Sequence, residues 1–226
     1  MKKYFFNLYL ILKNINNYGF FTFIYASIVE LFYLFKFRDF YSYIHDNSVT
    51  SDYFDTKIKN NYNTQHTPTP YYFLSLACSF VKKLNYEDFI VVDMGSGLGR
   101  VGKFFLNKFN CSFYGLEINK IFVKKLNRFS KKNKKFKVYN VDLKNKKLRN
   151  EILSEIKKQN KKIIIFFSDP FDIGTILNIL KFFKKKEHIV IGVNVNYLNK
   201  LFTCYKIEFS KFFKNKLRHV VLLTKK

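Results

Sequence analysis

From Phe89 to Asn194, short apolar runs alternate with amphipathic segments, and this alternation constrains the fold more than any other feature. Runs of five to seven apolar residues predict strands that are covered on both faces, and the segments between them have helical spacing. The expected strands are 89–93, 112–117, 137–141, 162–167 and 188–194, and the expected helices are 100–108, 120–132, 148–158 and 173–185. The pattern predicts an α/β fold with a mostly parallel sheet between two layers of helices.

The end of the chain departs from this alternation. Residues 205–209 and 219–224 are expected to be strands, and no full helix fits between them. Two strands joined in this way predict an antiparallel hairpin at one edge of the sheet, which brings the sheet to seven strands. We expect one large domain at 61–226, preceded by an aromatic-rich helical extension and connector at 1–60.

The extension contains an apolar run, Phe20–Phe35, with a single acid, Glu30, inside it. Its sixteen residues are fewer than the roughly 20 that span a bilayer. Two alternatives remain: the extension packs on the domain or on a second subunit, or residues 1–38 lie on an anionic membrane surface. We favour packing and expect residues 1–38 to be dispensable for ligand binding. After the connector, Pro70 is expected in the first turn of a helix that Thr69 caps.

The charge is strongly basic, with 41 Lys and Arg against 16 Asp and Glu and a net charge of +25. Such a balance usually indicates an anionic partner. Here only five of the 41 bases are arginine, and 29 Phe and 16 Tyr accompany them without any Trp. This profile is typical of an AT-rich coding bias. Binding to nucleic acid is therefore an alternative that we do not favour.

The cysteines and histidines argue against a disulfide framework and against a metal site. The chain has three widely separated cysteines, without C-x-x-C spacing, and four scattered histidines. An odd number of cysteines without such spacing is typical of a reducing compartment. We predict a cytoplasmic protein, peripheral at the membrane if residues 1–38 bind lipid, and no metal ligands.

Acidic residues stand at or just after the ends of four expected strands: Asp93, Glu117, Asp142 and Asp169. The carboxyl ends of parallel strands meet at one edge of the sheet, where α/β proteins bind their ligands. A single acid at such a place is commonly a turn former or a helix cap. Four in succession, in a chain of net charge +25, predict a ligand with hydroxyls, amines or positive charge.

The turn after the first strand reads Asp93-Met94-Gly95-Ser96-Gly97-Leu98-Gly99. Its glycines allow a tight turn and a close approach of a ligand to the backbone. The spacing is G-x-G-x-G, because Arg100 stands where the third glycine of G-x-G-x-x-G would be. At this point the sequence resembles the class I S-adenosylmethionine-dependent methyltransferases, in which an acid stands two residues before G-x-G-x-G.

The resemblance covers about residues 66–226 and implies a Rossmann-like fold with S-adenosylmethionine as the cofactor. It implies that Glu117, which ends the second motif, accepts hydrogen bonds from the ribose hydroxyls. It implies that Asp142, in the third motif, takes the adenine amino group. The residues that it assigns to the methionine part of the cofactor are Asp93, Gly95, Ser96, Gly97 and Gly99.

The fourth motif, Ser168-Asp169-Pro170-Phe171, falls where the family carries out methyl transfer. The resemblance implies that Asp169 and Phe171 line the pocket and that Asp169 orients or deprotonates an amine. Methyltransferases of nucleic-acid amino groups have two prolines here, so the single Pro170 disfavours base methylation. The chain looks most similar to bacterial relatives of the telomeric-silencing type of lysine methyltransferase.

Sequence analysis therefore predicts a methyltransferase whose acceptor is a nitrogen of a protein lysine or of a small molecule. The alternative is a membrane-associated or nucleic-acid-binding protein with a non-catalytic fold of this kind.

Overall fold

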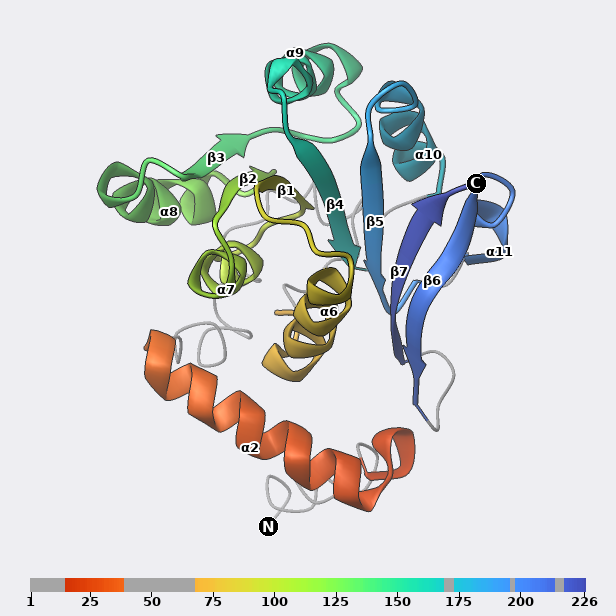
Figure 1. Ribbon diagram of the computed structural model, residues 1–226. Coiled ribbons are helices and arrows are strands. Elements are labelled where there is room, and N and C mark those ends of the chain that lie inside the picture. The colour runs from red at the N-terminus through yellow and green to blue at the C-terminus, as the bar shows by residue number, and fades with distance from the viewer. Residues whose placement is uncertain (1–14, 39–67, 169–172, 196–197, 214–217) are drawn as a thin grey trace, which may run out of the picture.

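The sheet has seven strands in the order β3-β2-β1-β4-β5-β7-β6 (Figure 1). The computed structural model describes residues 15–38, 68–168, 173–195, 198–213 and 218–226. Strands β1 to β5 are parallel, and β7 is antiparallel to both β5 and β6. The strands are β1 (Phe89–Met94), β2 (Cys111–Glu117), β3 (Phe136–Asn140), β4 (Lys162–Ser168), β5 (His188–Val193), β6 (Tyr205–Phe212) and β7 (His219–Lys225). The predicted fold class is confirmed.

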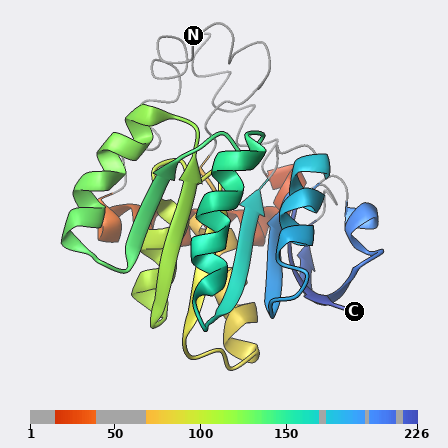
Figure 2. The same cartoon turned by 90° about the horizontal axis from the view of Figure 1, so that it is seen from above.

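Helices cover both faces of the sheet, because neighbouring residues of each strand point to opposite sides. Val91 and Phe113 belong to the core that includes α6 and α7, whereas Val92 and Tyr114 belong to the core beneath α9 and α10. Figure 2 shows α9 and α10 in front of the sheet and the ends of its parallel strands at one edge. The helices are α2 (Phe20–Phe37), α6 (Tyr71–Lys83), α7 (Arg100–Lys108), α8 (Lys120–Lys132), α9 (Lys146–Lys158), α10 (Ile173–Phe182) and α11 (Leu198–Leu201).

Three predicted helix ends were wrong, and one of them is the start of the helix expected at 148–158, which begins at Lys146. The helix expected at 173–185 ends at Phe182, where the backbone changes to i to i−3 hydrogen bonds such as Lys184 N–H to the Lys181 carbonyl, at 3.1 Å. This tightening is a common way to end a helix. Thr69 does not cap α6 either: Pro70 is the N-cap and has no side-chain cap hydrogen bond, and the first N–H of the helix, that of Tyr71, donates to Glu30 Oε2.

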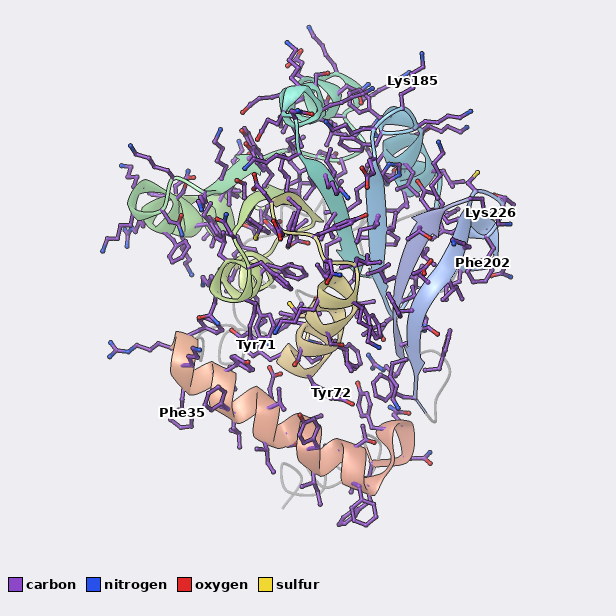
Figure 3. The ribbon with its side chains drawn as sticks, in the orientation of Figure 1. Phe35, Tyr71, Tyr72, Lys185, Phe202 and Lys226 are labelled. Atoms are coloured by element: carbon purple, nitrogen blue, oxygen red, sulfur yellow. The ribbon has the colours of Figure 1, made fainter. Side chains whose placement is uncertain are left out.

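Helix α2 forms an additional layer outside α6 (Figure 1). Its Tyr33 and Leu34 are buried in the same core as Tyr71 and Phe104. Tyr71 and Tyr72 project from α6 toward α2, whereas Phe35 points away from the domain (Figure 3). Phe20–Phe37 therefore packs on the domain, and contact of residues 1–38 with a membrane stays a prediction. Residues 1–14 lie outside the described part of the chain.

The strand order reverses beside β1, which has β2 on one side and β4 on the other. In open α/β sheets this reversal opens a crevice at the carboxyl ends of the strands, and ligands bind there. Met94 and Phe167 are register partners, so β1 and β4 end next to each other. The glycine turn and the fourth motif therefore follow neighbouring strands at the reversal.

Candidate functional site

The glycine turn has the backbone conformation that its sequence predicts. Gly95, Gly97 and Gly99 have φ values of +86°, +52° and +71°, in the left-handed region that other residues adopt at a cost. The N–H groups of Gly95 and Ser96 both donate to the Leu116 carbonyl, at 2.9 and 3.1 Å. These bonds attach the turn to the end of β2, so the first two motifs form one structural unit.

Close packing around the turn requires small residues. A Cβ atom at Gly115 would lie 2.7 Å from Ser96 Oγ, and one at Gly99 would lie 2.8 Å from the Phe136 ring. A glycine inside a strand commonly marks the close approach of another group. Gly115 thus lets the Ser96 side chain lie against β2.

Glu117 is buried, and it connects the glycine turn to the start of α8. Its Oε2 accepts the Gly97 N–H at 2.7 Å, and its Oε1 accepts the Asn119 N–H at 2.8 Å. Burial raises the pKa of Glu117, and the hydrogen bonds from backbone N–H groups oppose that rise. Each carboxylate oxygen has two lone pairs, so each can still accept a hydrogen bond from a ligand.

Asp93 lies at the end of β1 and is fully enclosed. Burial, and secondarily the Glu117 carboxylate, raise the pKa of Asp93 well above its ordinary value. Asp93 Oδ2 and Ser96 Oγ are buried and have no hydrogen-bond partner among the described residues. Unsatisfied buried polar atoms are costly and call for an explanation. Two neighbouring carboxyl groups and a free hydroxyl suit a ligand that brings positive charge and hydrogen-bond donors.

Asp142 lies after β3, at the same edge of the sheet. Its Oδ1 accepts the Lys144 N–H at 2.8 Å, in a turn that leads to α9. Asp142 is half-buried. The turn-forming role is therefore present, and the adenine contact stays a prediction. Asp169 and Phe171 lie outside the described residues, so their predicted roles also stay predictions.

Sequence reasoning missed an ion pair beneath the glycine turn. Arg100, the first residue of α7, is 4% exposed and donates from Nη1 to Glu30 Oε1 at 2.6 Å. Glu30 Oε2 also accepts the Tyr71 N–H at 2.6 Å, and the guanidinium carbon lies 4.3 Å from the centroid of the Tyr71 ring. A lone acid in an apolar helix was the available signal, since a buried charge requires a partner.

The described residues contain no group of three or more His, Cys, Asp or Glu side chains that could hold a metal ion. Cys78 and Cys111 are buried free thiols, and Cys204 is an exposed one. Burial raises the pKa of Cys78 above its ordinary range and that of Cys111 to about 12. These two thiols stay protonated near neutral pH and are poor nucleophiles.

Neither a family model nor a curated protein matches this sequence. Solved structures do match it. One is the ribosomal protein L11 methylase from Lactobacillus delbrueckii subsp. bulgaricus, at 13% identity and a TM-score of 0.50, over 70% of this chain and 81% of that one. The chain has the Rossmann-like methyltransferase fold.

Two further methyltransferase-fold structures are similar at lower scores. One is the precorrin-6y C5,15-methyltransferase from Geobacter metallireducens GS-15, at 13% identity and a TM-score of 0.49, over 72% of this chain and 92% of that one. The other is TrmK from M. capricolum in complex with S-adenosylhomocysteine, at 15% identity and a TM-score of 0.45, over 68% and 69% of the two chains. At 13% identity, the likeness to the L11 methylase establishes the fold alone. The narrower resemblance to telomeric-silencing-type enzymes stays a prediction.

Proposed function

We propose that this protein is an S-adenosylmethionine-dependent methyltransferase that transfers a methyl group to a nitrogen of a protein or a small molecule. One observation carries the proposal: buried, unpartnered polar atoms of Asp93 and Ser96 stand at a glycine turn beside Glu117, at the strand-order reversal.

The chemistry of these residues fits the cofactor. S-adenosylmethionine, when bound, supplies an electrophilic methyl group on a positively charged sulfonium, and it also carries an α-ammonium group and ribose hydroxyls. Asp93 and Glu117 are buried carboxyl groups, and each has a raised pKa without a ligand. A cationic ligand with hydrogen-bond donors relieves that cost, because it stabilises the charged form of both carboxyl groups.

Each of these residues has a distinct role in the proposed site. Asp93 Oδ2 and Ser96 Oγ bind the polar groups of the methionine part. Gly95, Gly97 and Gly99 keep side chains away from it. Glu117 accepts the ribose hydroxyls while its bond to Gly97 N–H, at 2.7 Å, keeps the turn in place, and Asp142 binds the adenine amino group.

Methyl transfer needs alignment of the nucleophile and, for an ammonium acceptor, removal of one proton. Asp169 follows β4, whose last residue is Ser168, and β4 ends next to the glycine turn. In this position a carboxylate can orient an amine and accept its proton. We infer that Phe171, in the same motif, also lines the methyl-transfer pocket. This arrangement favours nitrogen in a lysine or a small amine over a nucleic-acid base.

The proposal is tested with labelled S-adenosylmethionine and fractionated lysate from the source cells. We expect label in a protein or metabolite fraction, and we expect it to disappear when S-adenosylhomocysteine is added. If label appears only in RNA, the protein is a methyltransferase, but the proposed protein or small-molecule acceptor is wrong. If calorimetry detects binding of neither cofactor form, and binding to nucleic acid falls steeply with salt, the chain is a non-catalytic nucleic-acid-binding protein.

Asp169→Asn separates the acceptor role from the cofactor role. The substitution preserves the shape of the side chain but removes the base, so we expect turnover lower by ~100-fold or more and donor affinity within about threefold of wild type. Single-turnover transfer and equilibrium binding of the donor measure the two effects. Full activity would eliminate proton removal by Asp169, and a large loss of donor affinity would place Asp169 in the cofactor site.

A further inference from the structure

Helix α2 has two apolar faces, and within the described residues one of them packs on α6 and α7. The docked face contains Tyr33, Leu34 and Glu30. On the opposite face the side chains are between 41% and 85% exposed, and Phe21 is the most exposed. The residues of this face are Phe20, Phe21, Ile24, Ile28, Leu31 and Phe32, and Tyr25 at its border packs on Tyr72 of α6. At about 100° per residue they fall within an arc of about 120°, so they form one continuous surface, which we call the outer face of α2.

The outer face is unlike ordinary protein surface. Monomeric proteins seldom expose so many large apolar side chains together, and such patches mark protein or membrane interaction sites. The side chains of the outer face are all Phe, Ile or Leu and have no polar atom. Protein interfaces commonly make one hydrogen bond per 100–200 Å², roughly, and are poor in lysine. The outer face offers almost no such bonds, and lysines stand beside it.

Cationic side chains gather at the last turn of α2. Lys36 is in α2 and Lys108 is in α7. Their Nζ atoms lie 5.9 and 5.5 Å from the centroid of the Tyr33 ring. Lys36, Lys108 and the helix C-cap Arg38 are all exposed. An apolar helix face bordered by Lys and Arg is the pattern that binds the surface of an anionic bilayer.

Helix α2 is also long and apolar enough to cross a membrane, but its contacts argue against that orientation. A spanning helix would carry Glu30 into the hydrocarbon and separate it from Arg100, at 2.6 Å, and from the Tyr71 N–H, at 2.6 Å. Isolated charges in that environment are expensive. The ion pair keeps the helix on the domain, where only the outer face is available to lipid.

From this geometry we propose that the outer face of α2 binds the surface of an anionic lipid bilayer, with the helix in the membrane plane. Lys36, Arg38 and Lys108 contact the headgroups, and the aromatic and aliphatic side chains enter the boundary between headgroups and acyl chains. The proposal is independent of the methyltransferase proposal, since lipid binding needs neither cofactor nor acceptor.

Vesicle flotation with the full chain tests the proposal. The probes are vesicles of phosphatidylcholine alone and of phosphatidylcholine mixed with phosphatidylglycerol. We expect binding to the anionic vesicles. Phe21→Ser/Ile28→Ser/Phe32→Ser should lower the partition coefficient by at least ~100-fold, because three apolar side chains that enter the bilayer are lost. The matched control, Leu148→Ser/Ile207→Ser, removes exposed apolar side chains elsewhere and should leave binding unchanged.

A second variant tests the charges separately. Lys36→Gln/Lys108→Gln should weaken binding to anionic vesicles by roughly 30-fold, at about 1 kcal/mol per cation. Equal binding of wild type to neutral and anionic vesicles would overturn the anionic assignment. Unchanged vesicle binding by the triple serine variant would overturn the role of the outer face. Absence of wild-type binding to either kind of vesicle would overturn the whole proposal. In that case sedimentation shows whether a second copy covers the outer face, as a dimer that the triple variant converts to monomer.

Discussion

At the scale of single residues, Glu117 is the side chain on which two parts of the site depend. It holds Gly97 and Asn119 through hydrogen bonds of 2.7 and 2.8 Å and is proposed to bind the ribose. Glu117→Ala should lose charge-assisted hydrogen bonds of about 1.5–3 kcal/mol, which corresponds to roughly 10- to 150-fold in cofactor affinity. Calorimetry with S-adenosylhomocysteine measures the change. The control Glu151→Ala removes an exposed acid. Equal affinity in wild type and Glu117→Ala would refute the assignment.

Asp93 should make stability depend on pH in the direction opposite to that of most carboxylates. Its pKa is raised in the folded protein, so the folded state keeps a proton that the unfolded chain has already released. Stability therefore falls as pH rises from about 3.9, the ordinary carboxyl value, toward the raised pKa. Asp93→Asn should flatten this dependence, and Glu117, whose pKa is also raised, accounts for what remains.

Urea unfolding at several pH values measures this effect, with Asp88→Asn at an exposed ion pair with Lys161 as the control. A cationic ligand favours the charged form of Asp93, so cofactor affinity should rise with pH over the same window. A pH profile of unfolding that is identical in wild type and Asp93→Asn would show that Asp93 is not protonated in the folded protein.

At the scale of elements, the Glu30–Arg100 pair should determine how firmly α2 is attached. Arg100 is 4% exposed and Glu30 15% exposed, and removing one partner of a buried pair costs up to about 3–5 kcal/mol. Glu30→Ala should therefore lower the free energy of unfolding by about that amount. Glu155→Ala breaks the exposed pair with Lys137 and should cost about 1 kcal/mol or less. Denaturant titration compares the two variants, and similar small losses in both would mean that the Glu30 pair contributes little to stability.

The elements of the sheet could be predicted because their signals are local. The apolar run Lys162–Ser168 and the turn with three glycines need no tertiary information to be recognised. The pairing of Glu30 with Arg100 joins residues 70 positions apart, and no local pattern identifies the partner of a lone acid. The early end of α10, at Phe182, likewise depends on which backbone carbonyls the following turn uses.

The candidate residues of the site could be named from the sequence, but their hydrogen-bond partners could not. The places of Asp93, Glu117 and the glycines after strands were enough to name them as candidates, and their roles stay predictions. That Glu117 already accepts two backbone N–H groups, while Asp93 Oδ2 accepts none among the described residues, follows from side-chain positions in three dimensions. Only this difference distinguishes a residue that also supports the turn from one whose buried oxygen has no partner among the described residues.

At the scale of the whole molecule, the extension and the domain share one core, and this changes what a shortened chain should do. Sequence analysis alone predicts that residues 1–38 are dispensable for ligand binding. Tyr33 and Leu34, however, are buried against α6 and α7, and Glu30 pairs with the residue that follows Gly99. The glycine turn has its own bonds to β2. Removal of α2 should therefore affect stability much more than it affects the shape of the site.

We expect a chain that starts near Asn61 to have a Tm lower by ~10 °C or more, because about 5 kcal/mol of burial and ion pairing is lost. Cofactor should still raise that lower Tm, since ligand stabilisation depends on ligand concentration relative to Kd and not on the stability of the free protein. Thermal unfolding with and without S-adenosylhomocysteine measures both quantities. A shortened chain that unfolds at a lower temperature and also gains nothing from the ligand would show that α2, through Glu30 and Arg100, is needed to hold the glycine turn in its binding conformation.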